Sequence, residues 1–205
     1  WRIGGDSDTE EEFFGVIAQI DTGPEGDIYL LDQQLTEVQG FSRDGEYLRT
    51  LGREGEGPGE FRRPEDMFLL PDGNVGVLQL APGRIVTLSP QGEPMGDHPL
   101  PENEGGASAI LMNGQTMGDN LALEFSENTP HEGRVDINRF LALVGPEGKE
   151  KKRILESVRQ LAFVDFQFDE KDWQNFDDRW KVAPDGRLFV CVTFEDYAIT
   201  MWDVE

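Results

Sequence analysis

The chain has 205 residues, of which 41 are acidic and 18 basic, so its formal net charge is −23. This excess of negative charge repels phosphate backbones and anionic headgroups, which argues against nucleic-acid binding and electrostatic membrane attachment. No apolar run approaches the ~20 residues of a membrane-spanning helix, so we expect no direct membrane insertion. The single cysteine, Cys191, excludes an internal disulfide, and its place in a β-prone run favours a buried structural thiol.

The N-terminal 14 residues parallel a stretch found later in the chain. Trp1–Ile3, two glycines, an acidic run and an aromatic pair follow the same order as Arg49–Gly52 and the Gly/Glu-rich stretch that ends at Phe61. We therefore expect residues 1–14 to form the end of an outer strand and a connector. The acidic run Asp6–Glu12 lacks the glycine and the spaced glutamate of a calcium loop, so it is interpreted as solvated.

Two stretches, residues 24–52 and 71–99, repeat each other. In both, a Pro-acid-Gly turn, a β-prone run, a polar turn, a second β-prone run and a second Gly turn follow in order. Related turns occur further along, at a spacing of roughly 40 to 50 residues that insertions lengthen, as in four-stranded propeller blades. The first turn is expected at Glu25-Gly26, Asp72-Gly73, Asn113-Gly114 and Asp185-Gly186, and the second at Asp44-Gly45, Gln91-Gly92 and Glu147-Gly148.

The turn residues and the runs between them predict an all-β fold. We expect positive φ at Gly26, Gly45 and Gly73, because tight turns between antiparallel strands require it. Helix content should be below roughly 10%. The best helical candidate, Glu150–Gln160, fits an outer strand and connector as well. Strands are predicted at Asp27–Asp32, Glu37–Phe41, Glu46–Leu51, Arg84–Leu88 and Arg187–Phe194.

The run from Gly52 to Gln79 resembles the linker and strand pair of NHL-type repeats, in which a Gly-rich loop ending in Pro-Gly-x-Phe and then Pro leads into the innermost strand. The residues that match are Gly57, Pro58, Gly59, Phe61 and Pro64. The whole chain is similar to bacterial six-bladed propellers of this kind, strongly over residues 15–95 and weakly over 99–180.

The resemblance also implies an aspartate at the end of each second strand. Asp32 matches it, whereas Gln79 stands at the equivalent place in the next repeat. This departure weakens the expectation of a polar network repeated between blades.

We expect a single β-propeller domain over residues 1–205, with four-stranded antiparallel blades. Tyr197–Val204 is predicted to be the third strand of the last blade, which lacks its outer strand. The chain is then either part of a longer six-bladed ring or a small or open propeller closed by Trp1–Ile3. The predicted blades cover residues 15–52, 62–98, 105–157 and 160–205.

Residues for metal binding or catalysis are scarce. His98 and His131 lie in polar, proline-containing stretches that are interpreted as loops, and no His or Cys spacing fits a zinc site. We therefore expect no metal, no other cofactor and no catalytic residue.

The segment from Phe163 to Trp180 interleaves aromatic and acidic residues, as surfaces that dock onto a protein partner do. Trp173 and Phe176 are candidate binding residues, whereas Phe163, Phe166 and Phe168 are interpreted as alternating core residues of a strand. A second insertion, Asn128–Asn138, is polar and indicates no role. The acidic candidates beside the two aromatics are Asp172, Asp177 and Asp178.

These patterns favour a non-catalytic protein-interaction module, an extrinsic accessory or scaffolding subunit of a larger bacterial assembly. We expect an extracytoplasmic location, periplasmic or at a membrane surface, and a protein partner with a basic surface such as that of a membrane complex. Two alternatives stay open because propellers host all three functions. They are a sensor that binds a small molecule or peptide, and a lactonase- or lyase-like enzyme.

Overall fold

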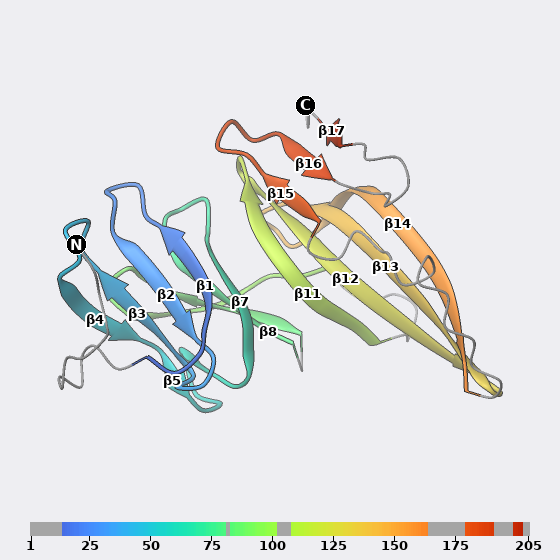
Figure 1. The fold of residues 1–205 in the computed structure, drawn as a ribbon, viewed down its shortest axis with the longest axis horizontal. Coiled ribbons are helices and arrows are strands. Elements are labelled where there is room, and N and C mark those ends of the chain that lie inside the picture. The colour runs from blue at the N-terminus through green and yellow to red at the C-terminus, as the bar shows by residue number, and fades with distance from the viewer. Residues whose placement is uncertain (1–13, 81–82, 102–107, 164–178, 191–198, 203–205) are drawn as a thin grey trace. The chain divides into compact units, whose positions relative to one another are not determined.

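The computed structural model describes residues 14–80, 83–101, 108–163, 179–190 and 199–202. Every regular element in these ranges is a β-strand (Figure 1), as the short, turn-bounded apolar runs predict. The chain divides into two compact units, Trp1–Pro99 and Leu100–Glu205, called unit 1 and unit 2 below. No helix long and apolar enough to cross a membrane occurs in the described ranges.

Unit 1 contains two four-stranded antiparallel meanders joined by a short connector. In each meander every strand pairs with the next one in sequence. The first sheet is β1 (Ile17–Thr22), β2 (Ile28–Asp32), β3 (Glu37–Phe41) and β4 (Tyr47–Leu51). The second is β7 (Pro64–Leu69), β8 (Val75–Gln79), β9 (Arg84–Leu88) and β10 (Pro94–His98). In the connector, β5 (Arg53–Glu54) and β6 (Glu60–Phe61) form a parallel pair.

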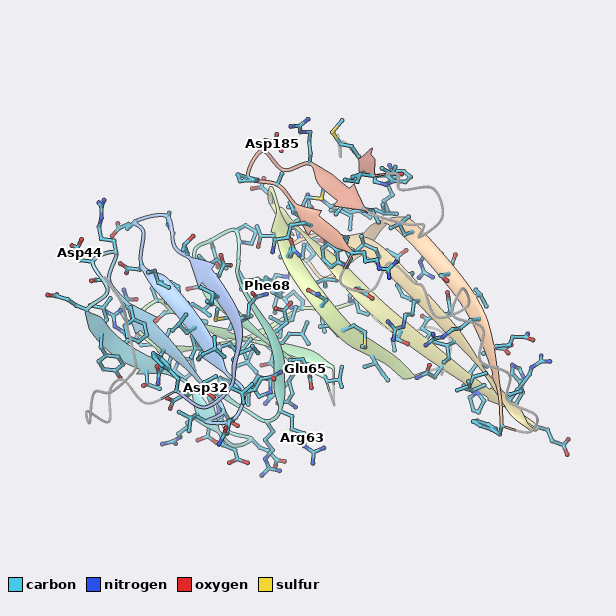
Figure 2. The ribbon with its side chains drawn as sticks, in the orientation of Figure 1. Asp32, Asp44, Arg63, Glu65, Phe68 and Asp185 are labelled. Carbon is cyan, nitrogen blue, oxygen red and sulfur yellow. The ribbon has the colours of Figure 1, made fainter. Side chains whose placement is uncertain are left out.

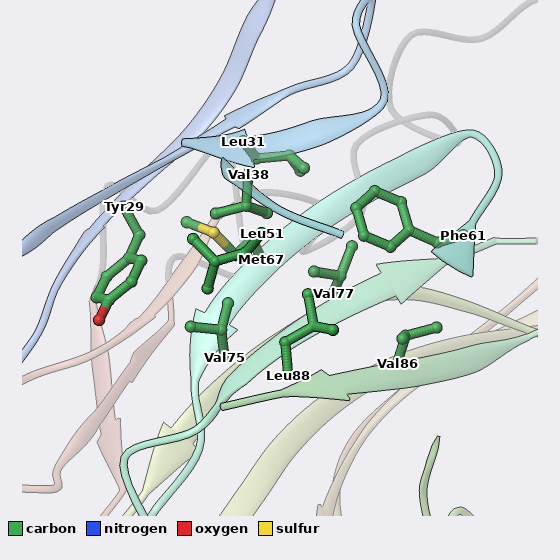
Figure 3. Packing of buried hydrophobic residues seen from close by; sticks show 10 residues of the cluster. All are labelled: Tyr29, Leu31, Val38, Leu51, Phe61, Met67, Val75, Val77, Val86 and Leu88. Atoms are coloured by element: carbon green, nitrogen blue, oxygen red, sulfur yellow. The ribbon is translucent and has the colours of Figure 1, made fainter. Parts of the chain in front are cut away.

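The core of unit 1 lies between its two sheets (Figure 3). Alternate residues of a strand point to the same face, so Leu31 on β2 and Val38 on β3, which are directly opposite in the ladder, both enter this core. Phe61 from the connector is fully buried beside them. The cluster consists of Tyr29, Leu31, Val38, Leu51, Phe61, Met67, Val75, Val77, Val86 and Leu88.

The predicted turns are confirmed at most positions. Gly26, Gly45 and Gly73 have φ of 89°, 84° and 83°, and the turns that end at Gly92, Gly148 and Gly186 also have positive φ.

The turn predicted at Asn113-Gly114 is wrong. Both residues lie inside a strand and pair with Glu124 and Leu123, next to a register shift at Leu111/Asn113. A glycine within a strand often marks such a bulge, which gives the same local signal as a turn. The actual hairpin turn comes after Met117, where Gly118 has φ of 59°.

Unit 2 contains a sheet of unusually long strands and a smaller sheet packed against it. The long sheet is β11 (Ser108–Met117), β12 (Asn120–His131), β13 (Arg134–Val144) and β14 (Glu150–Ala162). The small sheet is β15 (Trp180–Val182), β16 (Leu188–Val190) and β17 (Thr200–Trp202). Their shared core is Met117, Ala122, Leu141, Leu143, Ile154, Trp180, Leu188 and Val190.

The long sheet resolves two ambiguities of the sequence. Glu150–Gln160 is part of strand β14, not a helix, and its exposure alternates along the strand from Leu155 onwards. Residues 128–138, interpreted as an insertion of no evident role, are the outer parts of β12 and β13 and the turn between them. β14 also runs to Ala162, beyond the predicted blade boundary at 157.

The fold is therefore all-β, built from four-stranded antiparallel blades, with three strands described in the last sheet. Strand β17 falls within the predicted third strand, Tyr197–Val204. Trp1–Ile3, Asp6–Glu12 and Cys191 lie outside the described residues. The single-domain organisation stays a prediction.

Candidate binding surfaces

The five residues proposed from sequence for partner binding are not among the described ones. These are Trp173, Phe176, Asp172, Asp177 and Asp178, and Phe166 and Phe168 also lie outside the described ranges. Phe163, the first aromatic of the segment, is described. Its side chain is 66% exposed, so its interpretation as a core residue is wrong. The reason is its position one residue beyond the end of β14, where its backbone N–H donates to the carbonyl of Gly133 at 2.9 Å.

The outer half of the long sheet carries a polar network on one face. The Asn138 amide nitrogen donates to Glu156 Oε1 at 2.9 Å and to Glu127 Oε2 at 3.4 Å, which links three neighbouring strands. Arg153 reaches the same Glu156 oxygen at 3.2 Å. Its guanidinium lies 3.6 Å above the ring of Phe140. These interactions hold polar side chains in defined positions beside the exposed Val158.

A buried carboxylate lies where the long sheet meets the small one. Glu124 is 1% exposed, and its Oε2 accepts a hydrogen bond from the Trp180 indole nitrogen at 2.9 Å. Arg139 Nη1 lies 3.8 Å from the other oxygen, Oε1. The Gln115 side chain accepts from the Val182 backbone N–H at 2.9 Å, so polar bonds join the two sheets at two points. This arrangement orients β15 on the long sheet.

Both histidines lie at strand ends, so their interpretation as loop residues is wrong. His131 ends β12 and lies 3.1 Å from Asp136, whereas His98 ends β10. The prolines that suggested loops lie where β12 and β10 lose a neighbour or end, because a proline has no N–H to donate to a ladder. Pro99 and Pro101 come after the last residue of β10, and Pro130 lies beyond Asn128, where the described pairing of β12 with β11 ends.

His98 is partly buried, and its environment disfavours its charged form. Burial lowers the pKa of the imidazole, and the opposing charge of Asp72 compensates only in part. Within the described residues no group of three or more His, Cys, Asp or Glu side chains is arranged to hold a metal ion.

In unit 1 the Asp32 carboxylate organises the end of β2. It accepts backbone hydrogen bonds from Gly15 at 2.6 Å, Val16 at 3.1 Å, and Gln34 and Leu35 at 2.9 Å each. Burial opposes ionisation, but these four donors outweigh it and lower the pKa of Asp32. The carboxylate thus joins the entry to β1 to the turn after β2.

In the second sheet, Gln79 partly replaces the aspartate as an acceptor of backbone N–H groups. The departure from aspartate at this position therefore weakens the repeated polar network without abolishing it. Its Oε1 accepts from the Arg62 backbone N–H at 2.8 Å and from Arg84 Nη2 at 3.3 Å. The described hydrogen bonds of the Gln79 amide oxygen thus include one from a backbone N–H, whereas the Asp32 carboxylate accepts from four backbone N–H groups. The polar network is therefore repeated between the two sheets in reduced form.

Hydrogen bonds also join the two sheets of unit 1 directly. Gln19 Nε2 donates to the buried Asp66 at 2.9 Å, and Gln33 Nε2 donates to the Pro64 carbonyl at 2.9 Å. Figure 2 shows Asp32, Arg63 and Glu65 at one end of this unit, whereas Asp44 lies at the other.

A small depression lies over β2, β3 and β4. Its empty space of about 160 Å³ includes open solvent, and it encloses essentially no room for a water-sized molecule, whereas typical small-molecule sites enclose roughly 300–1,000 Å³. Its lining residues are Asp27, Tyr29, Gly40, Phe41, Leu48, Arg49 and Pro90.

Comparison with known proteins supports the fold. The family model DUF5128, described as a 6-bladed β-propeller, matches residues 8–109. A search of curated proteins found no match.

Several solved structures show a distant likeness. Virginiamycin B lyase from Staphylococcus aureus with quinupristin is 12% identical, with a TM-score of 0.47 over 92% of this chain and 55% of that one. The dihydro-heme d1 dehydrogenase NirN is 13% identical, with a TM-score of 0.48 over 94% of this chain and 34% of that one. A Bacteroides caccae protein of unknown function is 16% identical, with a TM-score of 0.41 over 86% and 70%. The chain thus spans about half of the lyase and a third of NirN, and likeness at this level assigns no activity.

The four-stranded antiparallel sheets and the match over residues 8–109 identify the chain as a β-propeller protein.

Proposed function

We propose that this protein is a non-catalytic interaction module, an extrinsic accessory or scaffolding subunit of a larger bacterial assembly. The observation that carries the proposal is the exposed ring of Phe163 on a fixed backbone. Its N–H is bonded to Gly133, so the chain displays an aromatic side chain at a defined place. Large exposed aromatics of this kind are typical anchors of protein interfaces.

Ordered groups lie further back along β14, on the strand that leads to this anchor. Val158 on β14 is 67% exposed, and its cross-strand neighbour Asn138 is hydrogen-bonded to Glu127 and Glu156. A side chain held in place loses less conformational entropy when a partner binds. The outer end of the long sheet therefore combines apolar contact area with prearranged polar groups.

The charged part of the interface is proposed to lie in the segment that follows Phe163. Trp173 and Phe176 would supply further anchors, and Asp172, Asp177 and Asp178 would attract a partner with a basic surface. The net charge of −23 supports such steering, because an acidic protein approaches a basic surface faster.

Several finer statements belong to the same proposal. We place the protein outside the cytoplasm, in the periplasm or at a membrane surface, bound to a membrane complex rather than inserted into the bilayer. Nucleic acid is not an expected partner. We also assign the repeats to the NHL type, on the match of Gly57–Phe61 and Pro64 to its connector.

The test is capture of a partner from bacterial membrane and periplasmic extracts with matched variants of the whole chain. Replacing Val158 and Phe163 by Ser should weaken association by about 2 kcal/mol or more, as loss of anchor residues does. The control is Ile20→Ser, because Ile20 is 59% exposed but lies on β1 of unit 1. Equal retention of the partner by both variants would contradict the proposed surface.

The same extracts test the following segment. Replacing Trp173 and Phe176 together by Ala should weaken binding while leaving the circular dichroism spectrum unchanged. Unfolding of this double variant, with no separable loss of binding, would assign the two aromatics to the core.

A further inference from the structure

Four arginines gather around the connector and the first residues of β7 in unit 1, and three of them have acidic partners. Among the described residues no hydrogen bond or ion pair is found for the exposed side chain of Arg63, the fourth. The pairs of the other three are Arg53–Glu60 at 2.6 Å, Arg62–Glu56 at 2.8 Å and Arg84–Asp97 at 3.6 Å. Arg63 therefore presents its guanidinium to solvent beside three paired arginines, and its backbone distinguishes it from another exposed arginine of the unit, Arg43.

The backbone of Arg63 is strained. Its φ is 46°, and Thr36, at 55°, is the other non-glycine with positive φ in the described part of the chain. This left-handed region is disfavoured for residues with a Cβ atom. Strain of this kind persists only when the surroundings enforce it, and it is concentrated at functional sites.

The surroundings do enforce it, from both sides of the residue. The Arg62 N–H is bonded to Gln79, and the Pro64 carbonyl accepts from Gln33. The repeat itself does not demand this conformation. At the equivalent place in the first sheet, the Val16 N–H is bonded to Asp32 at 3.1 Å, and φ there is not positive. The strain is thus specific to the loop that displays Arg63.

We propose that Arg63 is a binding residue for an oxyanion, a carboxylate or phosphate group carried by a ligand. A guanidinium presents a planar fork of N–H donors that matches such a group in a bidentate manner. The backbone bonds on both sides fix the position of the Arg63 Cα atom, from which the exposed side chain can reach a ligand. This site is independent of the surface at Phe163, and it would recognise an acidic group where that surface would recognise a basic one.

Titration of the whole chain with inorganic phosphate and, separately, with acetate tests the site. The NMR signal of the Arg63 Nε–H group should shift in a saturable manner, with at least fivefold tighter binding than the signal of Arg43. Arg43 is an exposed arginine of the same unit, next to Asp44 at the opposite end, and serves as an internal control. Saturation by both anions indicates a carboxylate or phosphate ligand, and saturation by phosphate alone indicates a phosphorylated one. Equal, weak responses of Arg63 and Arg43 to both anions would overturn the proposal.

A second measurement separates binding from strain. Arg63→Gln should abolish the saturable response, whereas Arg43→Gln should leave it intact. Arg63→Gly should also abolish it and, by relieving the strain, should raise the Tm by about 2 °C. A Tm that falls in Arg63→Gly, or a response that survives Arg63→Gln, refutes the assignment. These variants change no residue of the interface proposed at Val158 and Phe163, so failure of the Arg63 proposal is distinguishable from failure of the proposed function.

Discussion

Replacing Asp32 by Ala removes the acceptor of four backbone N–H groups at once. A hydrogen bond to a charged group contributes about 1.5–3 kcal/mol, but water can reach the partly exposed donors of the turn. We therefore expect unit 1 to lose about 3–5 kcal/mol of stability. Asp32→Asn keeps one accepting oxygen and should cost about 2 kcal/mol, whereas Gln79→Ala, which removes the acceptor of the Arg62 N–H, should cost about 1 kcal/mol.

The pH dependence of this loss has a defined sign. Because the folded-state pKa of Asp32 lies below its ordinary value of 3.8, its stabilisation is fully present above that pH. It is lost as the pH falls through the folded-state pKa. The difference in stability between wild type and Asp32→Asn should therefore be constant near neutrality and shrink below pH 3.8.

Urea unfolding followed by circular dichroism measures the free energy of unfolding of each variant, and hydrogen exchange shows which amides lose protection. In Asp32→Ala the amides of Gly15 and Val16 should exchange much faster, because both have lost their acceptor. A stability change below about 1 kcal/mol, or unchanged exchange at these amides, would refute the role given to the carboxylate.

Three further predictions follow from the described contacts. Gly52→Ala should cost at least about 2 kcal/mol more than Gly73→Ala in urea unfolding, because both have positive φ but only at Gly52 would the new Cβ collide with the buried Phe61 ring. Equal costs would show that the ring moves freely. Glu124→Leu should cost about 3 kcal/mol and shift the Trp180 fluorescence, whereas Glu124→Gln, which retains an acceptor, should cost about half as much. An unshifted spectrum in Glu124→Leu would contradict the indole bond. Because burial lowers the pKa of His98, its contribution to stability is full above the ordinary histidine pKa of 6.5 and is lost as the pH falls through the folded-state pKa. His98→Gln should remove this part of the acid destabilisation, measured by Tm against pH, and an identical profile would place His98 in solvent.

Much of unit 1 could be predicted because its turns and strands obey local rules. Arg84–Leu88 is both the predicted and the observed span of β9, since β-branched and apolar residues there are bounded by turns. The Asn113-Gly114 error arose because a bulge and a turn use the same residue pair. The alignment of Gln79 with Asp32 was visible in the sequence, but the number of N–H donors each accepts depends on loop geometry.

The long sheet and the candidate surfaces were harder to predict. The outer parts of β12 and β13 are polar on the face where Asn138 bridges two glutamates, so they lack the apolar alternation that signals a strand. The exposure of Phe163 depends on where β14 ends, which no local pattern specifies. Arg63 gave no signal either, because backbone strain is a property of the folded loop.

The two register shifts between β13 and β14, at Leu141/Ala142 and Leu143/Val144, have a consequence for self-association. Among the described strands β14 pairs only with β13, so it forms one edge of its sheet. Irregular pairing and lysines protect such an edge from joining a second sheet. The two register shifts and the lysines Lys151 and Lys152 all lie in the first half of β14, whereas Leu155–Ala162 pairs with β13 in an unbroken register. At high protein concentration, a strand of another molecule could pair with this regular second half of β14. Adding a charged side chain there should therefore delay aggregation.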